Sequence, residues 1–377
     1  MRPASAAERA RLNELFAELC AIPSPFGHER ACADRVTREL RSLGLEVVED
    51  DVAAKVGAGA GNLLARVPGA SPATVLLCAH LDTVAVQGRV EPVLVDGGWE
   101  NAHEAILGAD NKAAVAVLLE LARRCSVEGS PIGLELLFTV CEEDALAGAK
   151  AFDAGSLRSA FGYVLDHASP IGEVIVASPT YYRLSAEFHG AAAHAGIRPE
   201  DGRSAILAAA HAVAAMPHGR LDPETTVNVG SIAGGVGSTN VVPERCRLLA
   251  EVRSLSDERA EQVTAEVIDA LHDGAAAVEC DVDVECERLF EGYRHKPSAA
   301  PVAAAEAALT ACGYAPTRVV SGGGSDANAF EHAGLACVNL ANGTERNHEP
   351  GERVTVVALE SMLDVTLALL DEAAAAC

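Results

Sequence analysis

Short apolar runs alternate with helical patterns along most of this chain, and this alternation constrains its fold more than any other feature. The apolar runs EVVEDD, NLLARV, ATVLLCA, LELLFTV and FGYVLD occur with amphipathic or apolar helical segments such as ERARLNELFAELC and NKAAVAVLLELARR. Strands that alternate with helices are typical of an α/β domain with a mostly parallel sheet flanked by helices. We therefore expect a phosphorylase/hydrolase-like α/β domain.

The alternation of apolar runs and helical segments changes near Pro179, where a second pattern begins. From residue 182 to about 294 the segments follow the order strand, helix, strand, strand, helix, strand, which predicts a ferredoxin-like α+β unit. The α/β rhythm then resumes with VAAAEAALTACG, the strand ACVNLA and a last helix, VVALESMLDVTLALLDEA. The sequence thus predicts a discontinuous α/β domain of residues 1–179 and 295–377, interrupted by an α+β domain of residues 180–294.

The composition excludes several classes of partner. The 377 residues include 29 basic and 54 acidic side chains, for a net charge of −25, which disfavours nucleic acids and anionic membrane surfaces. No stretch approaches the roughly 18 apolar residues of a membrane span, and the charged amino-terminal segment does not resemble a signal peptide. The eleven cysteines occur singly, mostly within apolar runs, as reduced core thiols do. We expect a cytoplasmic protein without a cysteine metal site.

Acidic and imidazole side chains follow three of the apolar runs directly. His80 and Asp82 follow ATVLLCA, Glu142 and Glu143 follow LELLFTV, and Asp166 ends FGYVLD. In an open α/β sheet, ligands bind beyond the carboxyl ends of the strands, so these side chains can converge there.

A fourth acidic residue, Asp110 in LGADNKAAV, opens a helix, where an isolated aspartate would most often be an N-cap. Clustered carboxylates repel one another unless a cation neutralises them, and a mixture of imidazole and carboxylate suits zinc, manganese or cobalt. His348, in the polar run after ACVNLA, is the histidine best placed to complete such a site. The pair His103–Glu104 lacks the second histidine of an HExxH helix.

An ordered set of motifs indicates a family. HLDTV, LGADNKAA, EEDALAGAK, VLDHASPIGEVIV, GAAAHAG, GGVGSTNVVPE, GGGSDANAF and NHEPGE occur in this order across nearly the whole chain. Together they resemble the co-catalytic zinc metallopeptidases related to peptidase T (tripeptide aminopeptidase), glutamate carboxypeptidase and succinyl-diaminopimelate desuccinylase. LGADNKA and SPIGEVIV are most similar to the peptidase T-like branch. The resemblance implies that the α/β domain is catalytic and that the inserted domain is a lid used for dimerisation.

The resemblance also implies two zinc ions per subunit, with cobalt or manganese as possible substitutes. The implied metal ligands, with Asp110 bridging the two ions, are His80, Asp110, Glu143, Asp166 and His348. Asp82 would orient His80 as a carboxylate behind the ligand. Glu142 would be the general base that activates a metal-bridging water. A cis peptide between Asp110 and Asn111 is implied as well.

A substrate site is implied in the same way. His194 would stabilise the oxyanion, commonly from a partner subunit, although it could be a loop histidine without a role. Asn240 and Arg253 would hold a substrate carboxylate, unless Arg253 is simply an exposed strand residue. Ser325 and Asp326, in a glycine-rich loop, would provide backbone that contacts the substrate.

These features predict a homodimeric metallopeptidase that acts on short peptides with a free carboxylate, most readily by releasing the N-terminal residue of a tripeptide. An N-acyl amino acid amidohydrolase or a carboxypeptidase of the same fold is an alternative, and a non-enzymatic relative that binds peptide or metal is another. Asn111, Ala114 and Ala145 depart from the peptidase T-like pattern and, with His167, leave the substrate pocket open. The glycine-rich run GAGAGN at residues 57–62 predicts a tight turn rather than a dinucleotide loop, because a strand follows it.

Overall fold

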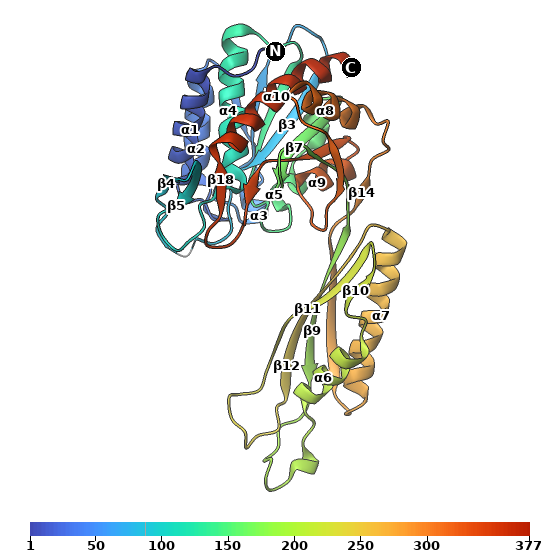
Figure 1. Ribbon diagram of the computed structural model, residues 1–377. Coiled ribbons are helices and arrows are strands. Elements are labelled where there is room, and N and C mark those ends of the chain that lie inside the picture. Colours follow the sequence, from blue (N-terminus) through green and yellow to red (C-terminus); the bar gives the residue numbers. More distant parts are fainter. Residues whose placement is uncertain (87) are drawn as a thin grey trace. The chain divides into compact units, whose positions relative to one another are not determined.

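The chain divides into two compact units (Figure 1). The computed structural model describes residues 1–86 and 88–377. One unit comprises Met1–Val176 with His295–Cys377, and the other comprises Ala177–Arg294. Within the described residues, no helix is long and apolar enough to cross a membrane.

The helices of the first unit bury their apolar residues in one large core. Helix α1 turns Leu12, Phe16 and Leu19 inward, as the helical spacing of these residues predicts. Helix α4 is buried along nearly its whole length and contacts α1, α10 and the strand β3. The helices are α1 (Ala6–Cys20), α2 (Arg30–Ser42), α3 (Ala53–Val56), α4 (Ala109–Glu128), α5 (Ala147–Ala151), α8 (Ala300–Ala311), α9 (Asp326–His332) and α10 (Val356–Ala376), with a 3-10 turn at η1 (Ala154–Ser156).

A large sheet forms the centre of this unit, in the order β1-β2-β6-β3-β7-β16-β8-β14, with β15 beside β8. Strand β14 and its partner residues in β8, Ala177 and Ser178, belong to the second unit by the division above. Its strands are β1 (Val47–Glu49), β2 (Leu63–Val67), β3 (Thr74–His80), β6 (Gly133–Thr139), β7 (Phe161–His167), β8 (Glu173–Ser178), β14 (Tyr293–Arg294), β15 (Thr317–Val320) and β16 (Cys337–Ala341). The central strands β6, β3, β7 and β16 are parallel, and β3 and β6 are buried on both faces. The predicted α/β architecture is confirmed, and the carboxyl ends of β6, β3 and β7 share one edge.

A second, smaller sheet was not predicted, because its strands are short and lack clear alternation. It has the order β17-β18-β5-β4, with bounds β4 (Pro92–Val95), β5 (Gly98–Asn101), β17 (Thr344–Glu345) and β18 (Arg353–Thr355). The loop between β17 and β18 carries His348, and the chain after β5 leads to Asp110. This sheet therefore brings together two segments that are far apart in the sequence.

The second unit has the predicted ferredoxin-like core. Its elements are β9 (Thr180–His189), η2 (Pro199–Asp201), α6 (Ala205–Ala215), β10 (Gly219–Asp222), β11 (Thr225–Gly234), β12 (Arg245–Ser254), α7 (Asp257–Ala276) and β13 (Asp281–Phe290). The strands lie in the order β10-β11-β12-β9-β13, so the short β10 is the one addition to the predicted order. Helices α6 and α7 contact each other, and a Cβ on Gly274 would lie 2.5 Å from the Ala212 nitrogen. This unit has its own hydrophobic core.

Candidate metal and catalytic site

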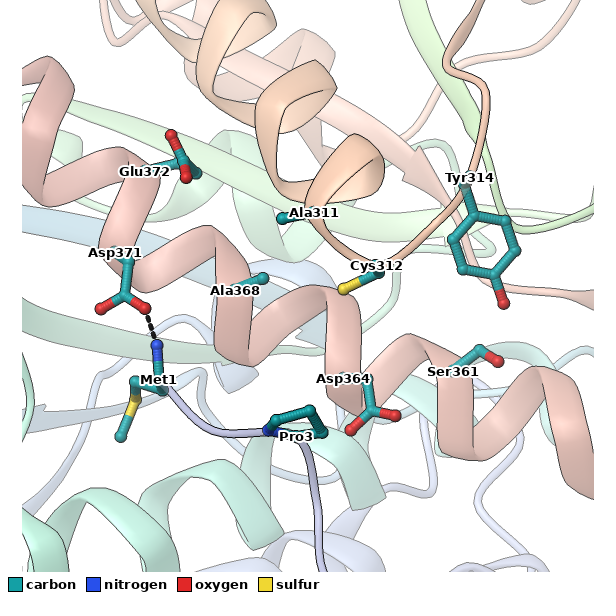
Figure 2. Close-up of a pocket in the computed structure, with 10 residues that line it drawn as sticks. All are labelled: Met1, Pro3, Ala311, Cys312, Tyr314, Ser361, Asp364, Ala368, Asp371 and Glu372. Carbon is teal, nitrogen blue, oxygen red and sulfur yellow. Dashed lines mark ion pairs between the residues drawn. The ribbon is translucent and has the colours of Figure 1, made fainter.

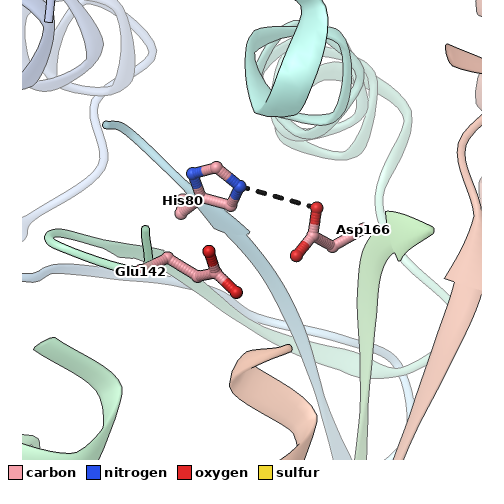
Figure 3. Close-up of side chains that lie close together, drawn as sticks. All are labelled: His80, Glu142 and Asp166. Carbon is pink, nitrogen blue, oxygen red and sulfur yellow. Dashed lines mark ion pairs between the residues drawn. The ribbon is translucent and has the colours of Figure 1, made fainter. Parts of the chain in front are cut away.

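Three strand ends of the large sheet bring His80, Glu142 and Asp166 together. His80 ends β3, Asp166 lies near the end of β7, and Glu142 follows β6. One ligand atom from each of the three lies within 4.8 Å of the others. Figure 3 shows the carboxylates of Glu142 and Asp166 close to the His80 imidazole, whose Nε2 is 3.5 Å from Asp166 Oδ1. The adjacency of β6, β3 and β7 thus produces the convergence that the strand-end motifs suggest.

Asp110 lies between two imidazoles. Its Oδ1 is 3.2 Å from His80 Nε2, and its Oδ2 is 3.1 Å from His348 Nε2. His348 Nε2 is also 3.0 Å from Glu143 Oε1. One carboxylate therefore faces two groups of side chains, His80 with Asp166 and His348 with Glu143.

The backbone around Asp110 rules out a simple capping role for this residue. The N-cap of α4 is Gly108, which has a φ of 76°, and Asp110 lies two residues inside the helix with non-helical dihedral angles. The Asp110–Asn111 peptide bond is cis. The contacts of its two oxygens show that the Asp110 carboxylate is directed toward His80 and His348.

Asp82 has two separate contacts at the site. His80 Nδ1 is 2.9 Å from the carbonyl oxygen of Asp82 and 3.6 Å from its carboxylate. When Nδ1 carries the proton and donates it to this carbonyl, Nε2 is unprotonated. Nε2 faces Asp110 and is therefore the nitrogen that can coordinate a metal ion. The Asp82 carboxylate instead accepts the backbone N–H groups of Glu142 and Glu143, both at 3.0 Å. Asp82 therefore contacts His80 through its main chain and fixes the Glu142–Glu143 segment through its side chain.

The buried charges raise the pKa values of two carboxyl groups and two imidazoles at the site. Burial and the neighbouring carboxylates raise the pKa values of Glu142 and Asp166 well above their usual range. Burial disfavours protonation of His80, but the carboxylates of Asp166 and Asp110 outweigh it and hold the His80 pKa well above its usual range. The hydrogen bond to Asp110, together with the nearby Glu143, raises the pKa of His348 to about 10.

The same residues have the donor chemistry of a divalent cation site. The cluster has more carboxylates than imidazoles, and Oε1 of Glu143 is buried without a hydrogen-bond partner of good geometry. A cation would neutralise the excess negative charge and would satisfy this oxygen. Imidazole nitrogen and carboxylate oxygen together suit zinc and similar ions, so the residues fit the implied metals.

The second unit brings some predicted substrate residues together and separates others. Ala195 N–H donates to the Asn240 carbonyl at 2.9 Å, and His194 forms a bridge with Val241, so His194 and Asn240 lie in adjacent segments. Arg253 lies toward the other end of β12, where its guanidinium contacts the Glu251 carboxylate and lies 4.1 Å from the centroid of the Tyr181 ring.

The pairing register of β9 with β12 shows how far apart the two ends of the sheet lie. Arg245, at the start of β12, pairs with His189, and Arg253 pairs with Tyr181. Eight residues (253 − 245) of extended strand span about 26 Å. Asn240 precedes the start of β12, so Asn240 and Arg253 lie toward opposite ends of this sheet.

Ser325 and Asp326 have contacts within the fold. Ser325 is the N-cap of α9, is buried, and its backbone N–H donates to Asn328 Oδ1 at 3.1 Å. Asp326 is buried, and its carboxylate accepts a hydrogen bond of 2.5 Å from the Thr139 hydroxyl. Both side chains are therefore held within the fold.

Other features singled out in the sequence have structural roles. The run GAGAGN is a close-packed turn before β2, in which a Cβ on Gly61 would lie 2.2 Å from the Asp50 carbonyl oxygen. His103 pairs with Glu91 at 3.2 Å, and both side chains are exposed. The cysteines are free thiols, and most of them are buried.

A separate cavity of about 360 Å³ lies beside the chain termini (Figure 2). Its lining includes Met1, Cys312 and Tyr314, and the Met1 amino group pairs with Asp371. Among the described residues that line it, there is no histidine and no member of the metal-ligand cluster. The strand-end cluster is therefore the better candidate for catalysis.

Comparisons with known proteins agree with this assignment. Residues 180–279 match the peptidase dimerisation domain of the M20 peptidases, and residues 62–171 match peptidase family M28. The structure is similar to aminopeptidase PepT from Bacillus cereus, with a TM-score of 0.88 and 36% identity over 97% of this chain and 99% of that chain. It is also similar to a tripeptidase from Staphylococcus aureus, with a TM-score of 0.93 and 31% identity over 97% and 99% of the two chains. The uncharacterized protein YqjE from Bacillus subtilis is 37% identical over 97% of this chain and 98% of its own length.

The dimerisation domain, inserted into an α/β unit with clustered carboxylates and imidazoles, defines an M20-type peptidase. The chain belongs to this family, within the peptidase T-like group that includes the Bacillus cereus and Staphylococcus aureus enzymes. The family resemblance in the sequence motifs is confirmed. One conspicuous residue of the site was missed by the sequence reasoning: Glu352, the last residue of the motif NHEPGE, is buried against the Asp110 segment.

Proposed function

We propose that this protein is a metal-dependent exopeptidase that releases the N-terminal residue from tripeptides. The observation that carries this proposal is Asp110, whose two carboxylate oxygens face two separate groups of metal-ligating side chains. The overall similarity to an aminopeptidase and a tripeptidase supports the choice of substrate class.

The proposed metals are two zinc ions, with cobalt or manganese as substitutes. His80 and Asp166 would hold one ion, Glu143 and His348 would hold the other, and Asp110 would bind both. Three protein ligands per ion leave an open position, as catalytic metal sites require. When bound, such ions polarise a carbonyl group and lower the pKa of water.

Glu142 is the proposed general base. It takes a proton from the attacking water and returns this proton to the leaving amine. We assign Glu142 to this role and not to metal binding. The ion beside His80 and Asp166 already has a third proposed ligand in Asp110, which contacts the same His80 nitrogen that faces Asp166. The hydrogen bonds from the Glu142 and Glu143 backbone to Asp82 hold the base in place beside the neighbouring ligand.

The first unit is the proposed catalytic domain, and the second is the proposed lid and dimerisation domain. His194 would stabilise the oxyanion, Asn240 and Arg253 would bind the substrate carboxylate, and the loop of Ser325 and Asp326 would contact substrate through its backbone. The match of the second unit to a peptidase dimerisation domain supports a homodimer, in which we assign His194 and Asn240 to the partner's active site. We propose a cytoplasmic location for the dimer.

A substrate panel tests this function. Metal-free protein is supplied with zinc, cobalt or manganese and offered tripeptides, dipeptides, and N-acetyl and N-succinyl amino acids. We expect metal-dependent release of the N-terminal residue from tripeptides, loss of activity with a chelator, and recovery when metal is added back. Turnover of the N-acyl amino acids alone would favour an amidohydrolase, and no turnover of any compound would favour a binding protein.

A further inference from the structure

Glu352 makes an unusual set of contacts beside the proposed metal site. Its side chain is buried, and the residue is only 1% exposed. Oε2 accepts the backbone N–H groups of Leu107 at 2.8 Å and Gly108 at 2.7 Å, and Oε1 accepts the N–H of Asp110 at 2.9 Å. A single carboxylate thus binds the main chain of the segment that presents Asp110.

This segment needs such a partner because α4 begins irregularly. Gly108 is the N-cap without a side-chain capping bond, and the dihedral angles of Asp110 and Asn111 are not helical. The first N–H groups of a helix lack partners within the helix, and a carboxylate at this end also interacts favourably with the helix dipole. One carboxyl group that accepts three backbone N–H groups fixes this segment in a single arrangement.

Glu352 also lies on the segment that carries His348. It is four residues beyond this histidine, in the connection from β17 to β18, and its own N–H donates to the Glu349 carbonyl at 3.1 Å. The His348 side chain is half exposed, so packing alone constrains it little. The carboxylate of Glu352 therefore ties the loop that carries His348 to the segment that carries Asp110.

We propose that Glu352 is a positioning residue that sets the separation of Asp110 and His348, and thereby the affinity for the ion held by Glu143 and His348. Asp110 Oδ2 and His348 Nε2 are 3.1 Å apart and come from segments joined at this carboxylate. This inference rests on the proposed metal site. It predicts a larger effect on the ion held by Glu143 and His348 than on the other ion. Asp110 is shared by both ions, but His80 and Asp166 belong to strands β3 and β7, which Glu352 does not join.

The substitution Glu352→Gln tests this role. A glutamine has nearly the same shape, but its NH₂ group would face a backbone N–H, so at least one of the three bonds is lost. We expect metal-free Glu352→Gln to bind the second zinc ion, the one held by Glu143 and His348, 10–100-fold more weakly than the unsubstituted protein, with a smaller loss for the first ion, the one held by His80 and Asp166. Zinc titration against a chromophoric chelator measures both affinities, and elemental analysis gives the number of ions. Glu349→Gln is the matched control, because Glu349 lies in the same loop, is exposed, and pairs only with Arg346 among the contacts described.

The outcomes separate this inference from the proposed function. If the unsubstituted protein binds fewer than two ions, the proposed metal site itself is wrong, and the role of Glu352 fails with it. If it binds two, and Glu352→Gln binds both with unchanged affinity, the positioning role is overturned while the metal site stands. Should Glu352→Gln not fold, Glu352→Asp replaces it, since it keeps the charge but shortens the reach by one methylene. Unchanged affinity for the second ion in that variant would overturn the proposal in the same way.

Discussion

At the scale of single residues, two side chains of the same chemistry have different partners because they occupy different positions in the site. Glu142 and Glu143 are neighbours, and Asp82 binds both of their N–H groups. Their carboxylates nevertheless differ in partners: Glu143 lies 3.0 Å from His348 Nε2, whereas Glu142 belongs to the group of His80 and Asp166. The two residues lie in the bend and turn that follow β6, so their carboxylates face different partners although the residues are adjacent in the sequence.

Replacement of Glu142 should separate catalysis from metal binding. We expect Glu142→Gln to retain both ions and to lower kcat by about 10²- to 10⁴-fold, because general-base catalysis typically contributes that much. Tripeptide hydrolysis gives kcat, and elemental analysis gives the metal content. Asp144→Asn is the control, since Asp144 is exposed two residues further along the same segment. Near-normal turnover would contradict the assignment, and the loss of one ion would make Glu142 a ligand.

At the scale of elements, buried ion pairs stabilise the packing of the helices around the site. Glu8 begins α1, accepts the Ser5 N–H at 2.7 Å in a capping box, and lies 2.8 Å from the Arg124 guanidinium on α4. Burial disfavours ionised Glu8, but the hydrogen bonds from Ser5 and Arg2 and the charge of Arg124 outweigh it and lower the pKa of Glu8 to about 2. Helix α4 carries Asp110 at its other end, so this pair helps to hold the helix that presents the bridging carboxylate.

The depressed pKa of Glu8 predicts a pH-dependent stability. Because the folded value lies below the ordinary value of 4.5, ionised Glu8 stabilises the fold fully above about pH 4.5, and this contribution disappears as the pH falls toward 2. We expect Glu8→Gln to lower the free energy of unfolding by about 2–3 kcal/mol at pH 7, with the difference shrinking below pH 4.5. Urea unfolding at several pH values measures this. Glu14→Gln, on an exposed position of the same helix, should have little effect, and an equal loss in both variants would show that the contacts of Glu8 are not responsible.

At the scale of the whole molecule, the main feature is the division into two units, each with its own hydrophobic core. The sheet of the second unit is long enough that Arg245 and Arg253 are about 26 Å apart along β12. His194 and Asn240 belong to one end of this sheet, and Arg253 lies toward the other. In the proposed dimer, His194 is assigned to the partner's site.

Complementation between inactive subunits tests that assignment. His194→Ala and Glu142→Gln should each be nearly inactive alone. If His194 acts across the dimer, mixed dimers contain one site with both residues intact, so random subunit exchange should restore about a quarter of the unsubstituted activity. The measurement is tripeptide hydrolysis after exchange, with each variant incubated alone as the control. No recovery in demonstrably mixed dimers would place His194 in its own subunit's site.

The sequence by itself determined the long elements, the interruption of one fold by another and the strand-end positions of the site residues. Burial imposes a period of about 3.6 residues on helices and of two on strands, and this local signal survives in the order of the amino acids. For this reason α4, β3 and β7 could be predicted, and so could the strand-end positions of His80 and Asp166.

Only the tertiary structure decided which segments meet. The contact of the Asp82 carboxylate with Glu142 and Glu143 requires β3 beside β6, and the contact of Glu352 with Asp110 joins positions 242 residues apart. The separation of Asn240 from Arg253 likewise follows from the register of β9 with β12. Such contacts depend on strand order and packing between distant segments, which leave no periodic pattern in either segment alone.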